Sequence, residues 1–331
     1  MLGIGRREFI TALGGAAAWP LAARAQQRER MRRIGWLSAG AENDPVSGPN
    51  RVVFQEALAK LGWIEGRNLR IERRFGADNS DLVRALAAEL VGLAPDVIAT
   101  VGGTATQAAL RQTQTIPIVF VGGPDAVVGG LVQNIARPEG NITGFSSREP
   151  SIAGKCLELL KEAAPRVTRA AIILNPDAAS GPSYISSIEA AVPALGVQAI
   201  KIPVRNAVDT VRAIDLFAAE PNGGIFVLPP PPATAILDAI LQPTSQHRLP
   251  AIYTNHADAA AGGLLVYAAD FVDISRRAAT YVDRILSGAK VNELPVQFPT
   301  KYDLVVNLKT AKAIGLSIPE SFLLRADEVV E

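Results

Sequence analysis

The sequence predicts an α/β fold made of two doubly wound, mostly parallel sheets. Three observations support this prediction. Short apolar runs alternate with longer amphipathic stretches, the order of strands and helices in right-handed βαβ units. The alternation pauses near residue 145 and then restarts in a second block, which indicates two lobes. The chain of 331 residues, 48% of them hydrophobic and 20% charged, is long enough to give each lobe its own core.

The first block opens with a buried apolar strand, and each later element follows from a local pattern. Apolar and basic residues alternate at 69–73, as in a strand. Gly62 ends the first amphipathic helix as a C-terminal stop. Gly102 and Gly103 stand directly before the third helix. The expected strands are 34–38, 69–73, 97–101 and 116–121, and the expected helices are 52–61, 81–92 and 104–113.

The second block repeats the same rhythm after the apolar segment 142–145. A helical pattern comes first here, and strands and helices then alternate, which again predicts parallel βαβ units. The expected helices are 152–163, 183–195, 208–219 and 234–247, and the expected strands are 170–174, 197–204, 224–228 and 251–254.

The last part of the chain does not look like a third domain, because its pieces are of the kind that complete existing sheets. They are a strand at 262–267, a helix at 273–287, strand character over 294–306 and a helix at 308–314. The chain is therefore expected to cross between the lobes more than once. We expect the first lobe to span 32–145 plus 264–290, and the second to span 146–263 plus 291–331.

The amino terminus has the pattern of an export signal. Arg6 and Arg7 form a charged start, residues 9–19 form a short apolar run, and Ala23-Arg24-Ala25 is an A-x-A cleavage site. The paired arginines before Glu8-Phe9-Ile10 resemble a twin-arginine signal. An ordinary signal with two adjacent basic residues is the alternative. We expect residues 1–25 to be removed near Ala25 and the mature protein to be periplasmic, without a later membrane helix.

Composition and motifs argue against several classes of function. The net charge of +1 gives no indication of nucleic acid as a partner. Cys156 is the sole cysteine and lies in a helical pattern, which favours a buried core residue over a nucleophile. His247 and His256 lack ligand-like spacing, so no metal site is expected. The chain has no G-x-S-x-G elbow, and no G-x-G-x-x-G follows the first strand. We therefore expect neither an enzyme nor a bound cofactor.

Candidate ligand-binding residues come from loops that follow strands, because ligands bind at the carboxyl ends of strands in open α/β sheets. Ser38 ends the first strand, and Gly102-Gly103-Thr104 follows the third. Glycines allow a close approach of the backbone, and a helix start favours an anion, although a purely structural turn and a capping role for Thr104 are the alternatives. Asp125 follows the next strand, where it would pair with a ligand ammonium or, alternatively, form an Asx turn or cap.

The second lobe contributes further candidates at its own strand ends. Asn175 and Asn255 each follow a strand, and Pro229 begins a run of four prolines that reads as a stiff cleft edge or as a linker. Aromatic faces for an apolar ligand come from Tyr184, Tyr253 and Tyr267. Tyr267 is expected where the chain crosses lobes, which makes it either hinge packing or cleft lining.

Seven segments of the chain form a recognisable set, namely 116–120 (IPIVF), 131–144 (LVQNIARPEGNITG), 250–253 (PAIY), 276–283 (RRAATYVD), 294–301 (LPVQFPTK), 306–312 (VNLKTAK) and 325–329 (RADEV). Together they resemble one family, the tryptophan/tyrosine-type substrate-binding proteins of ABC transporters. The resemblance covers nearly the whole mature chain and depends on the order and spacing of the segments. One departure is the order Gly123-Pro124-Asp125, where members of the family usually read Gly-Asp-Pro.

The resemblance implies a type I periplasmic-binding-protein fold with three inter-lobe connections, a cleft for a small ligand and no catalysis. It implies capture of an amino acid, aromatic or other, by hinge closure, and an ABC permease in the inner membrane as partner. A receptor for a sugar, nucleoside or aromatic acid on the same fold, in uptake or sensing, is the alternative. We expect a monomer.

Overall fold

The structure is a computed structural model that describes residues 31–44, 47–123, 125–178, 180–229 and 234–331. The chain divides into two compact units. Unit 1 contains a five-stranded sheet and unit 2 a seven-stranded one, and all neighbouring strands are parallel except one pair. The predicted α/β class with two mostly parallel sheets is confirmed. The predicted signal peptide, residues 1–25, lies outside the described residues.

The sheet of unit 1 has the order β2-β1-β3-β4-β5. Apart from the edge strand β2, its strands are largely buried apolar runs, as expected when helices cover both faces of a parallel sheet. Trp36 of β1 packs on Phe54 of α2 with ring centroids 4.9 Å apart, and Phe145 of β5 packs on Tyr281 of α10. The strands are β1 (Arg32–Ser38), β2 (Leu69–Phe75), β3 (Val97–Val101), β4 (Ile118–Val121) and β5 (Ile142–Phe145).

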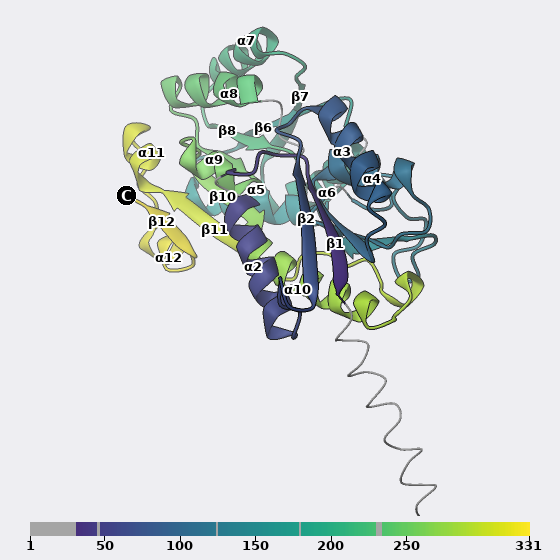
Figure 1. Ribbon diagram of the computed structural model, residues 1–331. Helices are drawn as coiled ribbons and strands as arrows, with labels where there is room; N and C mark the ends of the chain where they lie inside the picture. The colour runs from purple at the N-terminus through teal and green to yellow at the C-terminus, as the bar shows by residue number, and fades with distance from the viewer. Residues whose placement is uncertain (1–30, 45–46, 124, 179, 230–233) are drawn as a thin grey trace, which may run out of the picture. The chain divides into compact units, whose positions relative to one another are not determined.

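Two pairs of helices cover the faces of this sheet. Figure 1 shows α2 and α10 on one side of β1 and β2, and α3 and α4 on the other. Asn79 caps α3 by accepting hydrogen bonds from the N–H groups of Asp81 and Leu82. Trp63 Nε1 donates to Asp283 of α10 at 2.8 Å, which ties the end of α2 to α10. The helices are α2 (Ser47–Lys60), α3 (Ser80–Gly92), α4 (Gly103–Gln112) and α10 (Phe271–Leu286).

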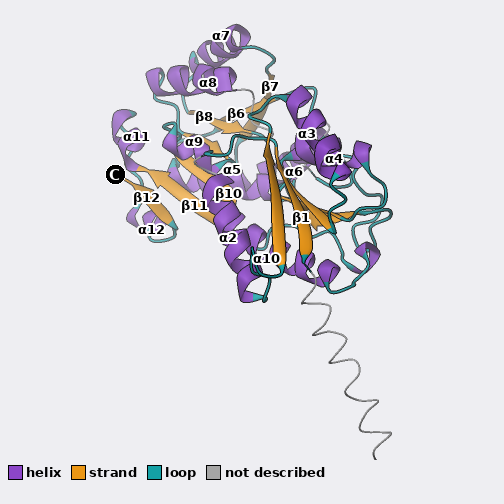
Figure 2. Ribbon diagram, in the orientation of Figure 1, coloured by secondary structure: helices purple, strands orange, loops and turns teal. Residues whose placement is uncertain are grey.

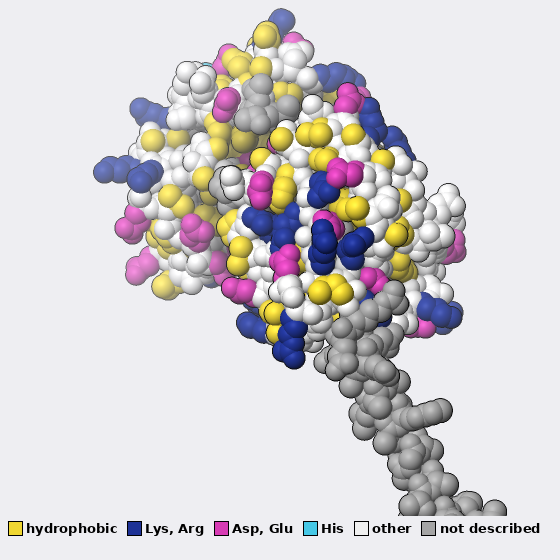
Figure 3. Space-filling view, in the orientation of Figure 1, with side chains coloured by type: hydrophobic (Ala, Val, Ile, Leu, Met, Phe, Trp, Pro, Cys, Tyr) yellow, Lys and Arg dark blue, Asp and Glu magenta, His cyan; other side chains and the backbone are white. Residues whose placement is uncertain are grey.

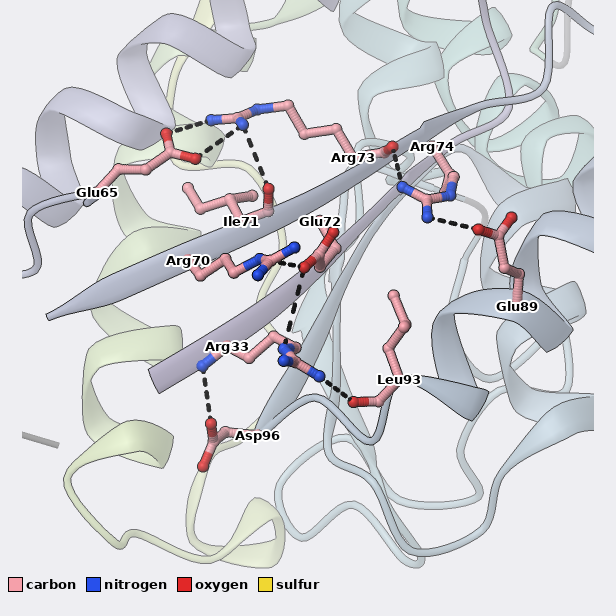
Figure 4. Close-up of polar contacts among 10 residues, drawn as sticks. All are labelled: Arg33, Glu65, Arg70, Ile71, Glu72, Arg73, Arg74, Glu89, Leu93 and Asp96. Atoms are coloured by element: carbon pink, nitrogen blue, oxygen red, sulfur yellow. Dashed lines mark hydrogen bonds and ion pairs between the residues drawn. The ribbon is translucent and has the colours of Figure 1, made fainter. Parts of the chain in front are cut away.

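β2 is the edge strand of the first sheet, and ion pairs cover it. Arg73 pairs with Glu65 at 2.5 Å, Arg70 with Glu72 at 2.5 Å and Arg74 with Glu89 at 2.6 Å. Figure 4 shows these pairs, and Figure 3 shows basic side chains with acidic ones between them over this part of the surface. Charged side chains on an edge strand oppose pairing with a second chain.

The sheet of unit 2 has the order β12-β11-β10-β9-β8-β6-β7, and only β10 and β11 are antiparallel. The strands are β6 (Arg169–Leu174), β7 (Gln198–Pro203), β8 (Gly223–Val227), β9 (Ala251–Tyr253), β10 (Leu265–Ala269), β11 (Tyr302–Asn307) and β12 (Glu328–Val330). The helices are α5 (Ile152–Ala163), α6 (Gly181–Leu195), α7 (Ala207–Ala218), α8 (Thr234–Gln246), α9 (His256–Ala260), α11 (Leu308–Ala313) and α12 (Glu320–Leu323), and a 3₁₀ turn at Val291–Glu293 belongs to unit 1.

Unit 2 has a separate apolar core on each face of its sheet. Side chains of α5, α6, α11 and α12 form one core, and side chains of α7, α8 and α9 form the other. Figure 2 shows α7 and α8 side by side above β6 and β8. Alternate residues of a strand point to opposite faces, so Leu265 joins the first core and Val266 the second. Tyr267, two residues after Leu265, packs on the first core.

The boundaries of the units differ from the predicted lobes in three places. The predicted strand at 262–267 is β10, and it pairs with β9 and β11 in the second sheet, so residues 264–274 belong to unit 2. Residues 291–296 belong to unit 1, where Thr143 Oγ1 donates to the Leu294 carbonyl at 2.6 Å. Residues 122–131 belong to unit 2 rather than to the first lobe. These assignments depend on pairing with distant segments, which local patterns do not reveal.

The chain passes between the units several times. Crossings occur after Phe145, after Ile274 and after Val296, and residues 122–131 form a further short excursion into unit 2. None of the helices in the described part of the chain combines the length and apolar character that a membrane crossing needs.

Candidate ligand-binding site

The predicted residues of unit 1 lie where its strand order reverses. β2 lies on one side of β1 and β3 on the other, so the carboxyl ends of β1 and β3 form the point at which doubly wound sheets bind ligands. Ser38 ends β1 and Gly102 directly follows β3. The structure thus brings these predicted residues to one edge of the first sheet, and their contact with a ligand remains a prediction.

The loop after β3 has a defined backbone. Gly102 has a φ of 87°, a value that favours glycine, and it is the N-cap of α4. Thr106 Oγ1 donates to the Gly102 carbonyl at 3.0 Å and lies 2.9 Å from Thr100 Oγ1, which fixes the turn from inside. Thr104 lies in the first turn of α4 with an exposed side chain. Thr104 is therefore not the N-cap residue, and its hydroxyl faces solvent.

Asp125 holds a turn of its own backbone, as the alternative interpretation of this residue predicted. Its Oδ1 accepts hydrogen bonds from the N–H groups of Val127 and Val128, each at 3.0 Å. We expected Asp125 in the same lobe as Gly102–Thr104, and this was wrong, because residues 122–131 belong to unit 2. The cause is local pairing, since Ser147 Oγ hydrogen-bonds the backbone of Gly123. One oxygen of Asp125 thus holds a turn beside the segment that leads into α5.

The carboxyl ends of β6, β8 and β9 form one edge of the second sheet, which we call the second carboxyl edge. Asn175, Pro229 and Asn255 lie there, as predicted from their positions after strands. Asn175 Oδ1 accepts from the Asp177 N–H at 3.0 Å, and Asn255 caps α9 through the Ala257 N–H. Pro229 is buried. The remaining three prolines of the run, residues 230–232, lie outside the described residues.

Tyr267 belongs to a group of polar and aromatic side chains near this edge. Its ring stacks on that of Tyr302 with centroids 5.2 Å apart and an interplanar angle of 21°. Tyr302 OH donates to Glu149 Oε2 at 2.8 Å, and Ser151 Oγ donates to Glu149 Oε1 at 2.7 Å. β10, which contains Tyr267, is an interior strand of the second sheet. We expected Tyr267 at a crossing between the units, and this was wrong, because residues 146–274 all belong to unit 2.

Tyr184 adds a buried hydroxyl to this group. It lies in the first turn of α6 with an exposed fraction of 0%, and its OH has no hydrogen-bond partner among the described residues. Burial raises the pKa of Tyr184 well above its usual range, the Arg148 charge opposes this rise, and the Asp125 and Glu149 charges add to it. The phenol therefore stays a neutral donor within electrostatic reach of both carboxylates and of Arg148.

Arg148 is the one cation in this group, and its guanidinium has no ion-pair or hydrogen-bond partner in the described part of the chain. Its backbone is fixed, because Arg148 N donates to Ser146 Oγ at 3.1 Å. Burial lowers the pKa of Arg148 below its usual value, and the nearby Tyr184 phenol opposes this shift. An arginine remains charged under any such shift. We call Arg148, Glu149, Tyr184, Tyr267 and Tyr302 the arginine–tyrosine cluster.

Sequence reasoning found only part of this cluster. Tyr184 and Tyr267 were aromatic candidates, whereas Arg148, Glu149 and Tyr302 were missed. Tyr302 and Glu149 are 153 positions apart in the chain, so no local spacing relates them. One signal was available, namely the alternation of side chains along a strand. Tyr302 lies two residues before Leu304 and so shares its face of the sheet, which is the face of the core that contains Tyr184. Tyr253, the third aromatic candidate, is 1% exposed and packs in the opposite core.

Pairs of titratable groups also lie on the other face of the second sheet. His256 Nε2 is 3.2 Å from Asp303 Oδ2. Burial raises the pKa of Asp303, the neighbouring Asp270 raises it further, and His256 opposes both effects. Asp258 is 2% exposed, its Oδ1 has no partner among the described residues, and burial raises its pKa to about 7. No group of three or more potential metal ligands lies together in the described chain.

Two pockets of unit 2 lie away from the second carboxyl edge. One of about 490 Å³ is bordered by Val167, Gly223 and Pro250, which stand at the amino ends of β6, β8 and β9. Another of about 390 Å³ is lined by Ala251 and Leu264 at the same opposite edge. Neither pocket contains a residue of the arginine–tyrosine cluster. Pocket volume therefore favours a ligand site at the amino ends of the strands, whereas the polar side chains favour one at the second carboxyl edge. The chemistry is the better guide, because unpaired donors and charges need a ligand whereas a surface hollow does not.

Comparisons with known proteins identify the family. A family model described as ABC transporter substrate binding protein matches residues 45–330. The tyrosine-binding protein of Clostridioides difficile is 23% identical over 266 residues, which are 80% of this chain and 75% of that protein. A conserved domain protein from Vibrio cholerae superposes with a TM-score of 0.78 and 26% identity, over 91% of this chain and 100% of the other. A protein from Streptococcus pneumoniae in complex with L-Trp has a TM-score of 0.78 and 21% identity, with the same coverage.

The family model describes substrate-binding proteins and the Clostridioides difficile relative is a binding protein rather than an enzyme, in agreement with the prediction. The predicted resemblance is confirmed by the family model, which covers most of the chain. Proteins of this family work outside the cytoplasm, bind a small molecule and serve a membrane transporter. The chain belongs to the ABC transporter substrate-binding protein family.

Proposed function

We propose that this protein is the solute-capturing component of an ABC importer and that its solute is an amino acid with an aromatic side chain. The observation that supports this most directly is the arginine–tyrosine cluster, where rings lie beside charges of both signs. Tyrosine rings suit an aromatic side chain, and opposite charges suit the two ends of a zwitterion. One relative is a tyrosine-binding protein and another was solved with L-Trp.

The other predicted site residues complete this proposal. Donors from Ser38 and from the backbone of Gly102-Gly103-Thr104 would contact the solute from unit 1, and Asp125 would accept its ammonium. Three further residues would line the second carboxyl edge, namely Asn175, Pro229 and Asn255. Asp125 has one carboxylate oxygen in its own turn, which leaves the second oxygen for a ligand.

Capture takes place by hinge closure of the two units, and a permease in the inner membrane recognises the closed form. The repeated passage of the chain between units supports this mechanism, because several connections confine motion to opening and closing. Solute binding would shift the population toward the closed form. Small-angle scattering with and without a solute that binds is the test, and an unchanged radius of gyration would count against closure.

Location follows from the amino-terminal pattern. We place the mature protein in the periplasm as a monomer, after export by the twin-arginine route and cleavage near Ala25. The support is the order of Arg6-Arg7, the apolar run and the A-x-A site.

A thermal-shift screen of the mature protein tests the class of solute. The panel contains the twenty amino acids, aromatic acids, nucleosides and sugars, each at the same concentration. L-tyrosine or L-tryptophan should raise the Tm most, because a ligand that binds only the folded state stabilises it by mass action. A rise confined to a sugar or a nucleoside would replace the amino acid with that solute and would favour the alternative receptor function.

A further inference from the structure

We propose that the guanidinium of Arg148 and the hydroxyl of Tyr184 together bind the carboxylate of the solute, so that unit 2 by itself recognises an α-amino acid. This inference rests on the proposed function and makes it more specific. It moves the carboxylate site from the helix start at Gly102–Thr104 in unit 1 to the second carboxyl edge.

The first step of the argument concerns the unpaired cation. Arg148 is half-buried, yet no carboxylate among the described residues lies within ion-pair distance of it. A poorly hydrated charge is costly unless it is paired. A guanidinium presents a planar fork of donors that matches a carboxylate. Arg148 is thus a cation whose natural partner is a planar anion.

The second step concerns the unpaired hydroxyl. Tyr184 is fully buried and its OH has no partner in the described chain. Buried polar groups are nearly always hydrogen-bonded in native proteins, so an exception calls for an explanation. The hydroxyl is not at the surface, where water could bind it, because the ring is packed in the core to which α5 and α6 contribute. Glu149, the residue after Arg148, hydrogen-bonds Tyr302 OH, and Tyr302 stacks on Tyr267, which packs on the same core as Tyr184. The electrostatic effect of Arg148 on the Tyr184 phenol agrees with this placement of the two donors.

The third step shows that the neighbouring carboxylates do not fill this role. Glu149 accepts from Tyr302 OH through one oxygen and from Ser151 Oγ through the other, and it forms no ion pair with Arg148. Asp125 holds its own turn through Oδ1. Both carboxylates nevertheless act on the Tyr184 phenol electrostatically. Two donors for an anion therefore lie within reach of two acidic groups, the arrangement that an α-amino acid requires.

The fourth step concerns the aromatic pair. Tyr267 and Tyr302 stack on each other, and Tyr302 is fixed by its bond to Glu149. A fixed ring next to a zwitterion site gives a flat apolar surface for a side chain. The solute class is thus an α-amino acid, with an aromatic side chain as the best fit.

Calorimetric titration of the mature protein with two matched ligand series tests the proposal. The first series is L-tyrosine, L-tyrosinamide, 3-(4-hydroxyphenyl)propionate and tyramine, and the second is the corresponding indole series from L-tryptophan to tryptamine. The amides and the amines lack the carboxylate and should bind at least about thirty-fold more weakly than the parent amino acid, because one charge of a buried pair is left unpaired.

Variants then assign the carboxylate site. Arg148→Gln should weaken L-tyrosine or L-tryptophan by at least about thirty-fold and should leave the affinity for the amide unchanged, so that the preference for acid over amide disappears. Arg148→Lys should be intermediate, because lysine retains the charge and loses the fork. Tyr184→Phe should weaken the amino acid by about ten-fold, the usual effect of a hydrogen bond to a charged group.

Matched controls separate binding from folding. Arg166→Gln removes an exposed arginine before β6, at the opposite edge of the same sheet, and should bind like the parent. Tyr253→Phe removes a hydroxyl from the core on the other face and should also bind like the parent. Tyr184→Phe keeps the ring and removes only an unpartnered hydroxyl, so its Tm should not fall, and it tests the proposal even if Arg148→Gln folds poorly.

The outcomes are distinguishable. If the parent binds L-tyrosine or L-tryptophan and both Arg148→Gln and Tyr184→Phe bind it equally well, the carboxylate assignment is wrong and the proposed function stands. If the parent binds acid and amide equally, the assignment is also wrong. If no member of either series binds the parent and a sugar or nucleoside does, the proposed function and this inference are overturned together.

Discussion

Asp125 shows how one carboxylate combines a local structural role with a proposed binding role. Its Oδ1 accepts two backbone N–H groups, and its charge reaches the Tyr184 phenol. Side chains that hold turns in this way contribute roughly 0.5–2 kcal/mol to the free energy of unfolding. Two substitutions can therefore separate stability from binding at this position.

We predict different results for Asp125→Ala and Asp125→Asn. Asp125→Ala should lower the unfolding free energy by about 1 kcal/mol, because the turn loses its acceptor, and should weaken the amino acid by about thirty-fold or more. Asp125→Asn retains an oxygen for the turn and should lose only the affinity. Thr104→Ala should weaken binding less, because the helix start of α4 would contact the solute from unit 1 without holding its carboxylate. Urea unfolding and calorimetry measure both quantities, and parent-like affinity of Asp125→Asn would refute the ammonium role.

Asp258 predicts a specific dependence of stability on pH. Burial raises the pKa of Asp258 to about 7 from the ordinary value of 3.8. At pH values between 3.8 and about 7, the folded state therefore binds more protons than the unfolded state. Stability should fall as pH rises through this window and should be lowest above about pH 7, where the buried carboxylate is charged.

Asp258→Asn should flatten this decline and raise the Tm at pH 8 relative to the parent. The measurement is a series of thermal unfolding curves from pH 4 to pH 8. Asp238→Asn, at an exposed position on α8, is the control and should leave the slope as it is in the parent. An unchanged slope in Asp258→Asn would show that the buried carboxylate does not titrate in this range.

At the scale of elements, sequence patterns predicted those strands and helices whose own residues determine them. The predicted bounds of β3 and α5 coincide with the observed Val97–Val101 and Ile152–Ala163, because each has a clear apolar period and a clear stop. β12 was missed, since Glu328 and Val329 are exposed and the strand exists only through pairing with β11. α9 was missed because its five residues are too few to show a period.

The same distinction applies to the candidate site. Ser38 ends a strand, and Gly102, Asn175 and Asn255 lie within two residues after one, so a rule about strand ends locates them from local sequence. Arg148 and Tyr184 gain their significance from being unpaired next to each other, which depends on how α5 and α6 pack on the sheet. Tertiary contacts of this kind cannot be obtained from residue spacing alone.

The edge strand β2 gives a prediction about self-association. Arg70→Val together with Glu72→Val removes a charge pair from the edge of the first sheet and leaves the net charge unchanged. The unfolding free energy should fall by about 1 kcal/mol, since Arg70 is exposed whereas Glu72 is 14% exposed and also lies 4.0 Å from Arg33. Light scattering at 37 °C, where the protein is still folded, should increase with time, because an apolar edge strand can pair with a second chain.

A control with the same change in charge tests whether the edge itself is responsible. Arg212→Val and Asp238→Val remove one charge of each sign from exposed positions on α7 and α8. Helical positions offer no free strand edge, so this variant should scatter like the parent. Equal aggregation of the two double variants would attribute the effect to surface hydrophobicity in general.

At the scale of the whole molecule, the export route is testable independently of ligand chemistry. Replacement of Arg6 and Arg7 by lysine retains the charge and removes the paired arginines that twin-arginine export requires. We predict that Arg6→Lys with Arg7→Lys leaves unprocessed precursor in the cytoplasm. Cell fractionation shows where the protein resides, and amino-terminal sequencing should find Gln26 as the first residue of the mature parent. Normal maturation of the double variant would indicate the general secretory route.

The claim on which this account depends is that the mature protein captures an aromatic amino acid through its carboxylate. Calorimetric titration of the purified protein with L-tyrosine and L-tryptophan, beside their amides, measures this directly. We predict one site per chain for at least one of the two amino acids, with the corresponding amide about thirty-fold weaker or more. Binding of acid and amide with equal affinity, or no binding of either amino acid, would contradict the account.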